Sequence, residues 1–151
     1  MNLMQRVAAI FGVAFVAVGL LGFTVTGVTM PTMHGLHETM EGAPRLLGLF
    51  PVNVTHNLVH VALGVWGLIA ARGQRGALTY ALASGVLYAT LAGVGAFWPT
   101  VAGIVPIGGY DVGLHLAIGV VLIGCAVYAM TTESDAPVSA ASPAASGDAR
   151  R

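Results

Sequence analysis

Four long runs of apolar residues, separated by short polar segments, dominate the pattern along this chain. They cover about residues 7–28, 54–71, 77–97 and 112–130. A helix that crosses a membrane needs about 20 mostly apolar residues, and only helices and closed barrels satisfy every backbone group in lipid. The runs lack the alternating pattern of barrel strands. We therefore predict an all-α membrane protein, with four transmembrane helices in one domain over residues 1–130.

The composition agrees with a lipid environment. Hydrophobic residues make up 56% of the chain and charged residues only 8%, whereas soluble domains carry about 25% charged residues. The formal net charge is zero, so no basic surface is available for nucleic acid. Cys125 is the single cysteine, which excludes an internal disulfide and a zinc-finger motif. The expected partner is the lipid bilayer, and nucleic acid is not a partner.

The arginines predict the orientation of the spans. Arg72 and Arg75 lie between the second and third runs, Arg6 precedes the first, and Arg150 and Arg151 end the chain. Positive loops face the cytoplasm, so we expect both termini there. All six basic residues are arginine, which with the abundant Ala, Gly and Val is typical of a GC-rich bacterial genome. The predicted location is the bacterial cytoplasmic (inner) membrane.

Residues 131–151 differ from the rest of the chain. They are mainly Ala, Ser, Pro, Asp and Gly, with almost no large apolar side chain. Such a segment cannot bury enough apolar surface to offset the entropy lost on ordering. We predict a disordered cytoplasmic tail.

A block of sequence occurs twice, 55 residues apart. Residues 48–65 align with residues 103–120 without a gap, and shared positions include Pro51/Pro106, His60/His115 and Gly64/Gly119. The preceding runs match more weakly at an offset of 73, with Gly12, Phe15 and Gly22 aligned to Gly85, Tyr88 and Gly95. We predict two parallel helical-hairpin repeats, related by a pseudo-twofold axis along the membrane normal.

Polar residues gather near the start of the second and fourth runs. His56 and His60 are four residues apart and share a helical face, and Asn53 and Asn57 belong to the same string. The matching string in the second half carries Asp111 and His115. By the repeat, both strings lie at the same depth near the outer surface, so we expect these candidates to converge between two spans: His56, His60, Asp111 and His115.

Three interpretations of this polar cluster stay open. Three imidazoles and a carboxylate suit zinc, copper, iron or nickel, and two histidines on facing helices can ligate haem. Alternatively the cluster is structural: Asp111 caps the fourth helix, Asn53 or Thr55 caps the second, and the histidines join the hairpins. Ionisable groups inside a membrane also handle protons or small molecules.

A second cluster lies in the first outer loop. His34 and His37 stand among Met30, Met33 and Met40. Methionine and histidine are ligands that suit copper. The alternative is a short interfacial helix over residues 33–41, with apolar side chains toward lipid and polar ones toward water.

Small residues recur along the third run at Ala81, Gly85, Ala89 and Gly93. Such stripes pack helices within one bundle or between protein chains. The chain lacks a nucleophile elbow, a phosphate loop and a zinc-protease motif, so we expect a non-enzymatic protein that packs with itself or with a membrane-protein partner. The alternatives are a metal- or haem-binding redox or sensing protein, and a small oligomeric transporter or channel.

The strings at 47–64 and 111–122 resemble an uncharacterised family of small four-span bacterial membrane proteins, described only as a domain of unknown function. The most specific element is N-x-x-H-N-x-x-H-x-x-x-G, formed here by Asn53, His56, Asn57, His60 and Gly64. The resemblance covers roughly residues 5–130. It implies the four-helix architecture and no activity.

Overall fold

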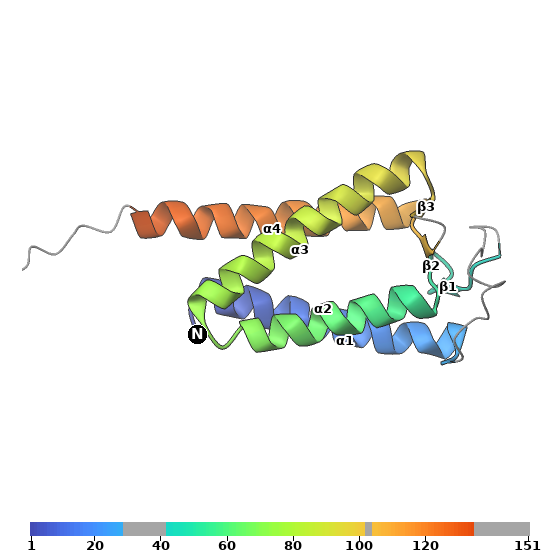
Figure 1. Cartoon of the computed structure of the whole chain (residues 1–151), viewed down its shortest axis with the longest axis horizontal. Coiled ribbons are helices and arrows are strands. Elements are labelled where there is room, and N and C mark those ends of the chain that lie inside the picture. The colour runs from blue at the N-terminus through green and yellow to red at the C-terminus, as the bar shows by residue number, and fades with distance from the viewer. Residues whose placement is uncertain (29–41, 102–103, 135–151) are drawn as a thin grey trace, which may run out of the picture.

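The computed structural model describes residues 1–28, 42–101 and 104–134. Four helices carry the fold, and two pairs of very short strands lie between them (Figure 1). In chain order the elements are α1 (Leu3–Thr26), β1 (Arg45–Leu46), β2 (Phe50–Pro51), α2 (Val54–Ala70), α3 (Gln74–Phe97), β3 (Thr100–Val101), β4 (Val105–Pro106) and α4 (Tyr110–Ser134). The predicted all-α class with four helices is confirmed.

The helices have the length and composition of a membrane protein. Within the described residues, α1, α3 and α4 are long and apolar enough to cross a membrane. Helix α2 is equally apolar but has 17 residues, which at about 1.5 Å per residue is close to 25 Å. Because the hydrocarbon core is about 30 Å thick, α2 needs its flanking residues to complete a crossing.

The ends of the first and last helices differ from those of the predicted spans. Helix α1 begins at Leu3 because Asn2 and Gln5 form a capping box, and it ends at Thr26 because Gly27 leaves the helix with φ +70°. Helix α4 continues to Ser134, beyond the predicted end of the span. The rest of the predicted tail, and the Met/His cluster with His34 and His37, lie outside the described residues.

The helices form two antiparallel hairpins, α1 with α2 and α3 with α4 (Figure 1). Glycines allow the close approach in both. A Cβ atom on Gly64 would lie 2.7 Å from the carbonyl oxygen of Gly12, and one on Gly119 would lie 3.0 Å from that of Gly85. The aligned glycine pairs of the two halves therefore make the same backbone contact, which supports the predicted repeat.

The strand pairs join α1 to α2 and α3 to α4. Residue Arg45 pairs with Pro51 in the first, and Thr100 pairs with Pro106 in the second. Both strand pairs are antiparallel, and their residues are 55 positions apart in the sequence. The common register is a second observation in support of the repeat. Both pairs lie at the same end of the bundle, beside the first turns of α2 and α4 (Figure 1).

Candidate functional site

Asn53 positions the first polar turn of α2. Its Oδ1 atom accepts a hydrogen bond from the backbone N–H of His56 at 2.8 Å, which makes it the N-cap as predicted. Its Nδ2 atom donates to the carbonyl oxygen of Ile104 at 2.6 Å. One side chain therefore starts α2 and ties it to the loop between β3 and β4.

His60 and His115 make the same local hydrogen bond. The Nδ1 atom of each ring lies near the carbonyl oxygen four residues earlier, at 3.1 Å from that of His56 and at 2.8 Å from that of Asp111. A carbonyl oxygen only accepts, so each Nδ1 carries the proton and each Nε2 keeps its lone pair. Metal-binding histidines are commonly oriented in this way.

Phe15 and Tyr88, which align in the two halves, meet between the hairpins. Their rings stack with centroids 5.0 Å apart. Phe15 also contacts His60 at 5.6 Å, and Tyr88 contacts His115 at 5.0 Å. The two halves differ in one contact. The Tyr88 hydroxyl lies 3.4 Å from Nε2 of His60, whereas Phe15, which aligns with Tyr88, has no hydroxyl that could contact His115.

Three side chains of the predicted cluster form a group with metal-ligand geometry. His56, Asp111 and His115 each offer one ligand atom, and these atoms all lie within 4.8 Å of one another. Their exposed fractions are only 5%, 3% and 2%. His60 is adjacent, with its ring stacked on His56 at 4.6 Å between centroids. It is not part of the group, and its Nε2 atom faces the Tyr88 hydroxyl. We call His56, Asp111 and His115 the triad.

Two polar atoms of the triad have no hydrogen-bond partner among the described residues: Nδ1 of His56 and Oδ2 of Asp111. The other carboxylate oxygen of Asp111 lies 3.2 Å from Nδ1 of His115. A buried polar group without a partner is costly, and most such groups in proteins are satisfied. The donor set therefore fits a cation held between the two imidazoles and the carboxylate.

Asp111 does not have its expected capping role, and Asn57 joins two helices. Asp111 lies in the first turn of α4, which begins at Tyr110, so it does not cap that helix. Asn57 is buried and donates from Nδ2 to the Thr26 hydroxyl at 2.9 Å, which joins α2 to the end of α1. Gly22 leaves the space for this amide, since any Cβ atom there would overlap it. Asn57 therefore helps to pack the two helices of the first hairpin.

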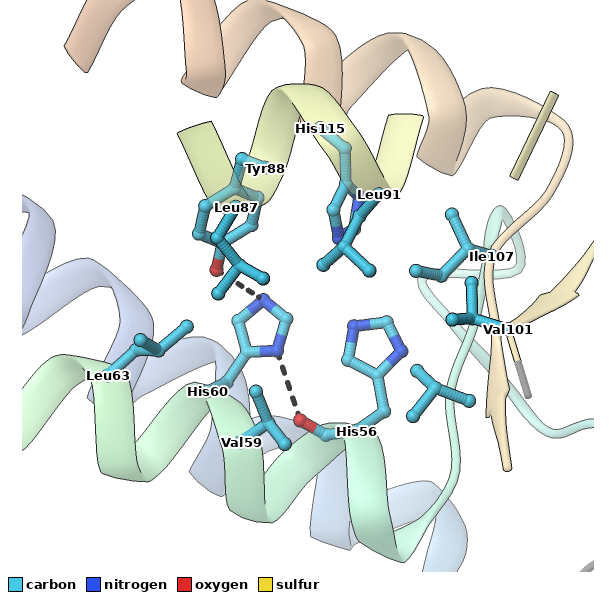
Figure 2. A pocket seen from close by; sticks show the side chains of 11 residues that line it. His56, Val59, His60, Leu63, Leu87, Tyr88, Leu91, Val101, Ile107 and His115 are labelled. Carbon is cyan, nitrogen blue, oxygen red and sulfur yellow. Dashed lines mark hydrogen bonds between the residues drawn. The ribbon is translucent and has the colours of Figure 1, made fainter. Parts of the chain in front are cut away.

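The imidazoles separate two cavities. The first, about 210 Å³, lies between α2 and α3, and Figure 2 shows His56, His60 and His115 among the aliphatic side chains that line it. The second, about 110 Å³, lies between α4 and α1 and reaches all three triad residues. Their linings match across the aligned positions: Val59, Leu63 and Leu91 in the first, and Leu114, Ile118 and Val18 in the second.

The cavities restrict what the cluster can bind. Ligand sites for drug-sized molecules are usually about 300–1,000 Å³, so neither cavity has room for a haem. Aliphatic side chains form most of their walls. Between the ligand atoms themselves, which lie within 4.8 Å of one another, the cluster accommodates a single ion.

Two further residues contact the polar cluster but lie outside the polar strings of the sequence: Tyr88 and Thr26. Tyr88 is fully buried in α3, and a tyrosine inside an apolar run needs a partner for its hydroxyl. The need of the Tyr88 hydroxyl for a partner, together with the alignment of Tyr88 to Phe15, could have indicated its place beside the histidines. Thr26 had no comparable signal, because its partner comes from another helix.

The comparison with protein families agrees with this architecture. The family described as a domain of unknown function (DUF4383) matches residues 5–128. No curated protein matches the chain significantly, and no solved structure does. The match covers all four helices almost completely, and the chain therefore belongs to the DUF4383 family.

Proposed function

We propose that this membrane protein binds one transition-metal ion at the triad. The observation that carries the proposal is the convergence of three buried ligand atoms within 4.8 Å, two of whose side chains hold an unpartnered polar atom. A buried carboxylate is stable only when paired or coordinated. A bound cation supplies a partner to both unpartnered atoms.

The donor set favours an exchangeable site over a structural one. Structural zinc sites have four protein ligands, whereas sites that bind a further ligand have three and keep a position open. Two histidines and a carboxylate also form the ligand set of many non-haem iron sites. We propose iron as the leading metal and a sensing or redox role, with zinc, copper and nickel as alternatives.

Metal titration of the purified protein in lipid nanodiscs tests this proposal. We expect one Fe²⁺ ion per chain. Loss of a residue that only hydrogen-bonds a metal ligand lowers the affinity about 10–100-fold, and Asp111→Asn, which removes a ligand, should lower it further. His60→Gln is the matched control, because His60 is a buried imidazole of the same cluster outside the triad. Equal binding by the wild type and Asp111→Asn would refute the triad.

We also propose that the protein resides in the cytoplasmic membrane with both termini and the Arg72–Arg75 loop inside. The arginine distribution supports this orientation. Trp98 and Tyr110 are exposed beside the strand pairs, where an aromatic belt at the outer surface is expected. In this orientation the triad lies near the outer face.

A packing role through the small-residue stripe has less support. A Cβ atom on Gly119 would lie 2.8 Å from the backbone nitrogen of Ala89, so α4 already covers this part of α3. Ala81 is fully buried. Of the two glycines in the stripe, Gly85 contacts α4 and only Gly93 borders open space, so little of the stripe is free for a second copy or a partner protein.

A further inference from the structure

We infer that the triad metal takes a small apolar ligand, of the size of a diatomic gas, which enters from the lipid through the cavity between α2 and α3. The inference rests on the proposed metal site and adds the class of its exchangeable ligand. Two imidazoles of the triad, His56 and His115, line this cavity. A ligand within it therefore lies directly beside the metal-binding group (Figure 2).

The size of the cavity limits its occupant. Its volume is about 210 Å³, and an apolar protein cavity of about 150 Å³ can hold benzene or xenon. A lipid or another drug-sized ligand needs a larger site, usually about 300–1,000 Å³. The cavity therefore suits molecules of a few atoms.

The walls select for an apolar molecule. Apart from the imidazoles and Tyr88, the lining is aliphatic, and it includes Leu63, Leu87, Leu91 and Ile107. The ring nitrogens of His60 are already engaged, one with the backbone and one with Tyr88. An ion or a strongly hydrated molecule would lose its water here without new hydrogen bonds.

The mouth of the cavity faces the membrane. Val59 on α2 and Leu87 on α3 line it and are 40% and 38% exposed. In a spanning bundle this exposed surface contacts lipid. Apolar molecules leave water for hydrocarbon spontaneously, so the bilayer concentrates such a ligand at the entrance.

The second cavity supports the same ligand class. It is smaller, about 110 Å³, and touches His56, Asp111 and His115 together. Its outer wall carries Val18 and Leu114, which are also partly exposed. The triad is thus bordered on two sides by small spaces lined largely by aliphatic side chains, and neither side offers a route for a large ligand.

Nitric oxide binding to the Fe²⁺-loaded protein tests the inference. The protein is prepared without oxygen in nanodiscs of phosphatidylethanolamine and phosphatidylglycerol, and iron nitrosyl formation is followed by electron paramagnetic resonance and stopped-flow absorbance. We expect a nitrosyl adduct in the wild type, and much slower binding of azide, an anion. Leu87→Trp fills the entrance and should slow nitric oxide binding several-fold. Val86→Trp, on the neighbouring lipid-exposed position outside the cavity lining, should not.

Each outcome has a defined meaning once the iron content of every variant has been measured. Iron without a nitrosyl adduct, equal rates for Leu87→Trp and Val86→Trp, or azide binding as fast as nitric oxide would overturn the inference and leave the metal site intact. A co-purified lipid chain that blocks nitric oxide would overturn it as well. Failure to bind iron, or any of the alternative metals, would instead remove the proposed function on which the inference depends.

Discussion

The imidazole rings of His56 and His115 lie with their centroids 6.0 Å apart and their planes at 67°, although α2 and α4 belong to different hairpins. Neither hairpin alone assembles the triad. The Asn53 contact with Ile104 and the stack of Phe15 on Tyr88 join the hairpins on either side of this pair. The geometry of the site therefore depends on how the hairpins dock.

Gly64→Ala should destabilise the first hairpin. Its Cβ atom would lie 2.6 Å from the backbone nitrogen of Val16 and 2.7 Å from the carbonyl oxygen of Gly12, and backbone atoms cannot rotate away. Overpacking of this kind costs typically about 1–3 kcal/mol. The free energy of unfolding, measured by steric trapping in bicelles, should fall by this amount.

Gly93→Ala is the matched control for this substitution. Nothing lies within 4 Å of its added Cβ atom, and alanine is favoured over glycine inside a helix by roughly 0.5–1 kcal/mol. We expect unchanged or slightly higher stability. A loss equal to that of Gly64→Ala would contradict the proposed hairpin contact.

Asn53→Ala should lower the free energy of unfolding by about 0.5–2 kcal/mol through loss of the α2 cap. Loss of the hydrogen bond to Ile104 should lower it further. Asn53→Ser separates the two effects, since serine caps helices but lacks the amide donor. Thermal unfolding in detergent should rank the wild type above the serine variant and the serine variant above the alanine variant. Equal stability of the two variants would argue against a role for the cap.

Tyr88→Phe removes the hydroxyl that faces Nε2 of His60 and changes little else. We expect a loss of about 0.5–1.5 kcal/mol, the usual net value of one hydrogen bond. Tyr128→Phe is the control because Tyr128 is exposed on α4. If both variants unfolded like the wild type, the contact between Tyr88 and His60 would have no energetic role.

Cysteine labelling tests the proposed orientation. In a Cys125→Ser background, Leu47→Cys should react with an impermeant maleimide on intact cells, because Leu47 is 81% exposed beside β1. Arg72→Cys, also at an exposed position, should react only after the membrane is opened. The reverse labelling pattern would show that the chain has the opposite orientation in the membrane.

Hydropathy and the duplicated block predicted much of this architecture. Long apolar runs identify helices because lipid permits few alternatives, and the shared register of His60 and His115 brought the polar strings to one depth. Asn53 was recognisable as a cap because N-capping depends on local sequence. These features are encoded within a few residues of where they act.

Which of the candidate residues form the triad could not be predicted from the sequence and became visible only in the structure. His56 and His60 share a helical face, and only the position of Tyr88 on another helix decides that His60 turns away. Likewise, the polar string at the start of α2 does not reveal that Asn57 bonds to Thr26 on another helix. The strand pairs are two residues per strand, too short for a periodic pattern to reveal.

X-ray absorption spectroscopy at the iron edge of the Fe²⁺-loaded protein tests the central claim most directly. The proposed triad predicts an iron centre with two imidazole ligands and carboxylate oxygen in its first shell, and the loss of one imidazole contribution in His115→Ala. A protein that binds no iron, or iron whose spectrum contains no imidazole and does not change in His115→Ala, would contradict a metal site at His56, Asp111 and His115.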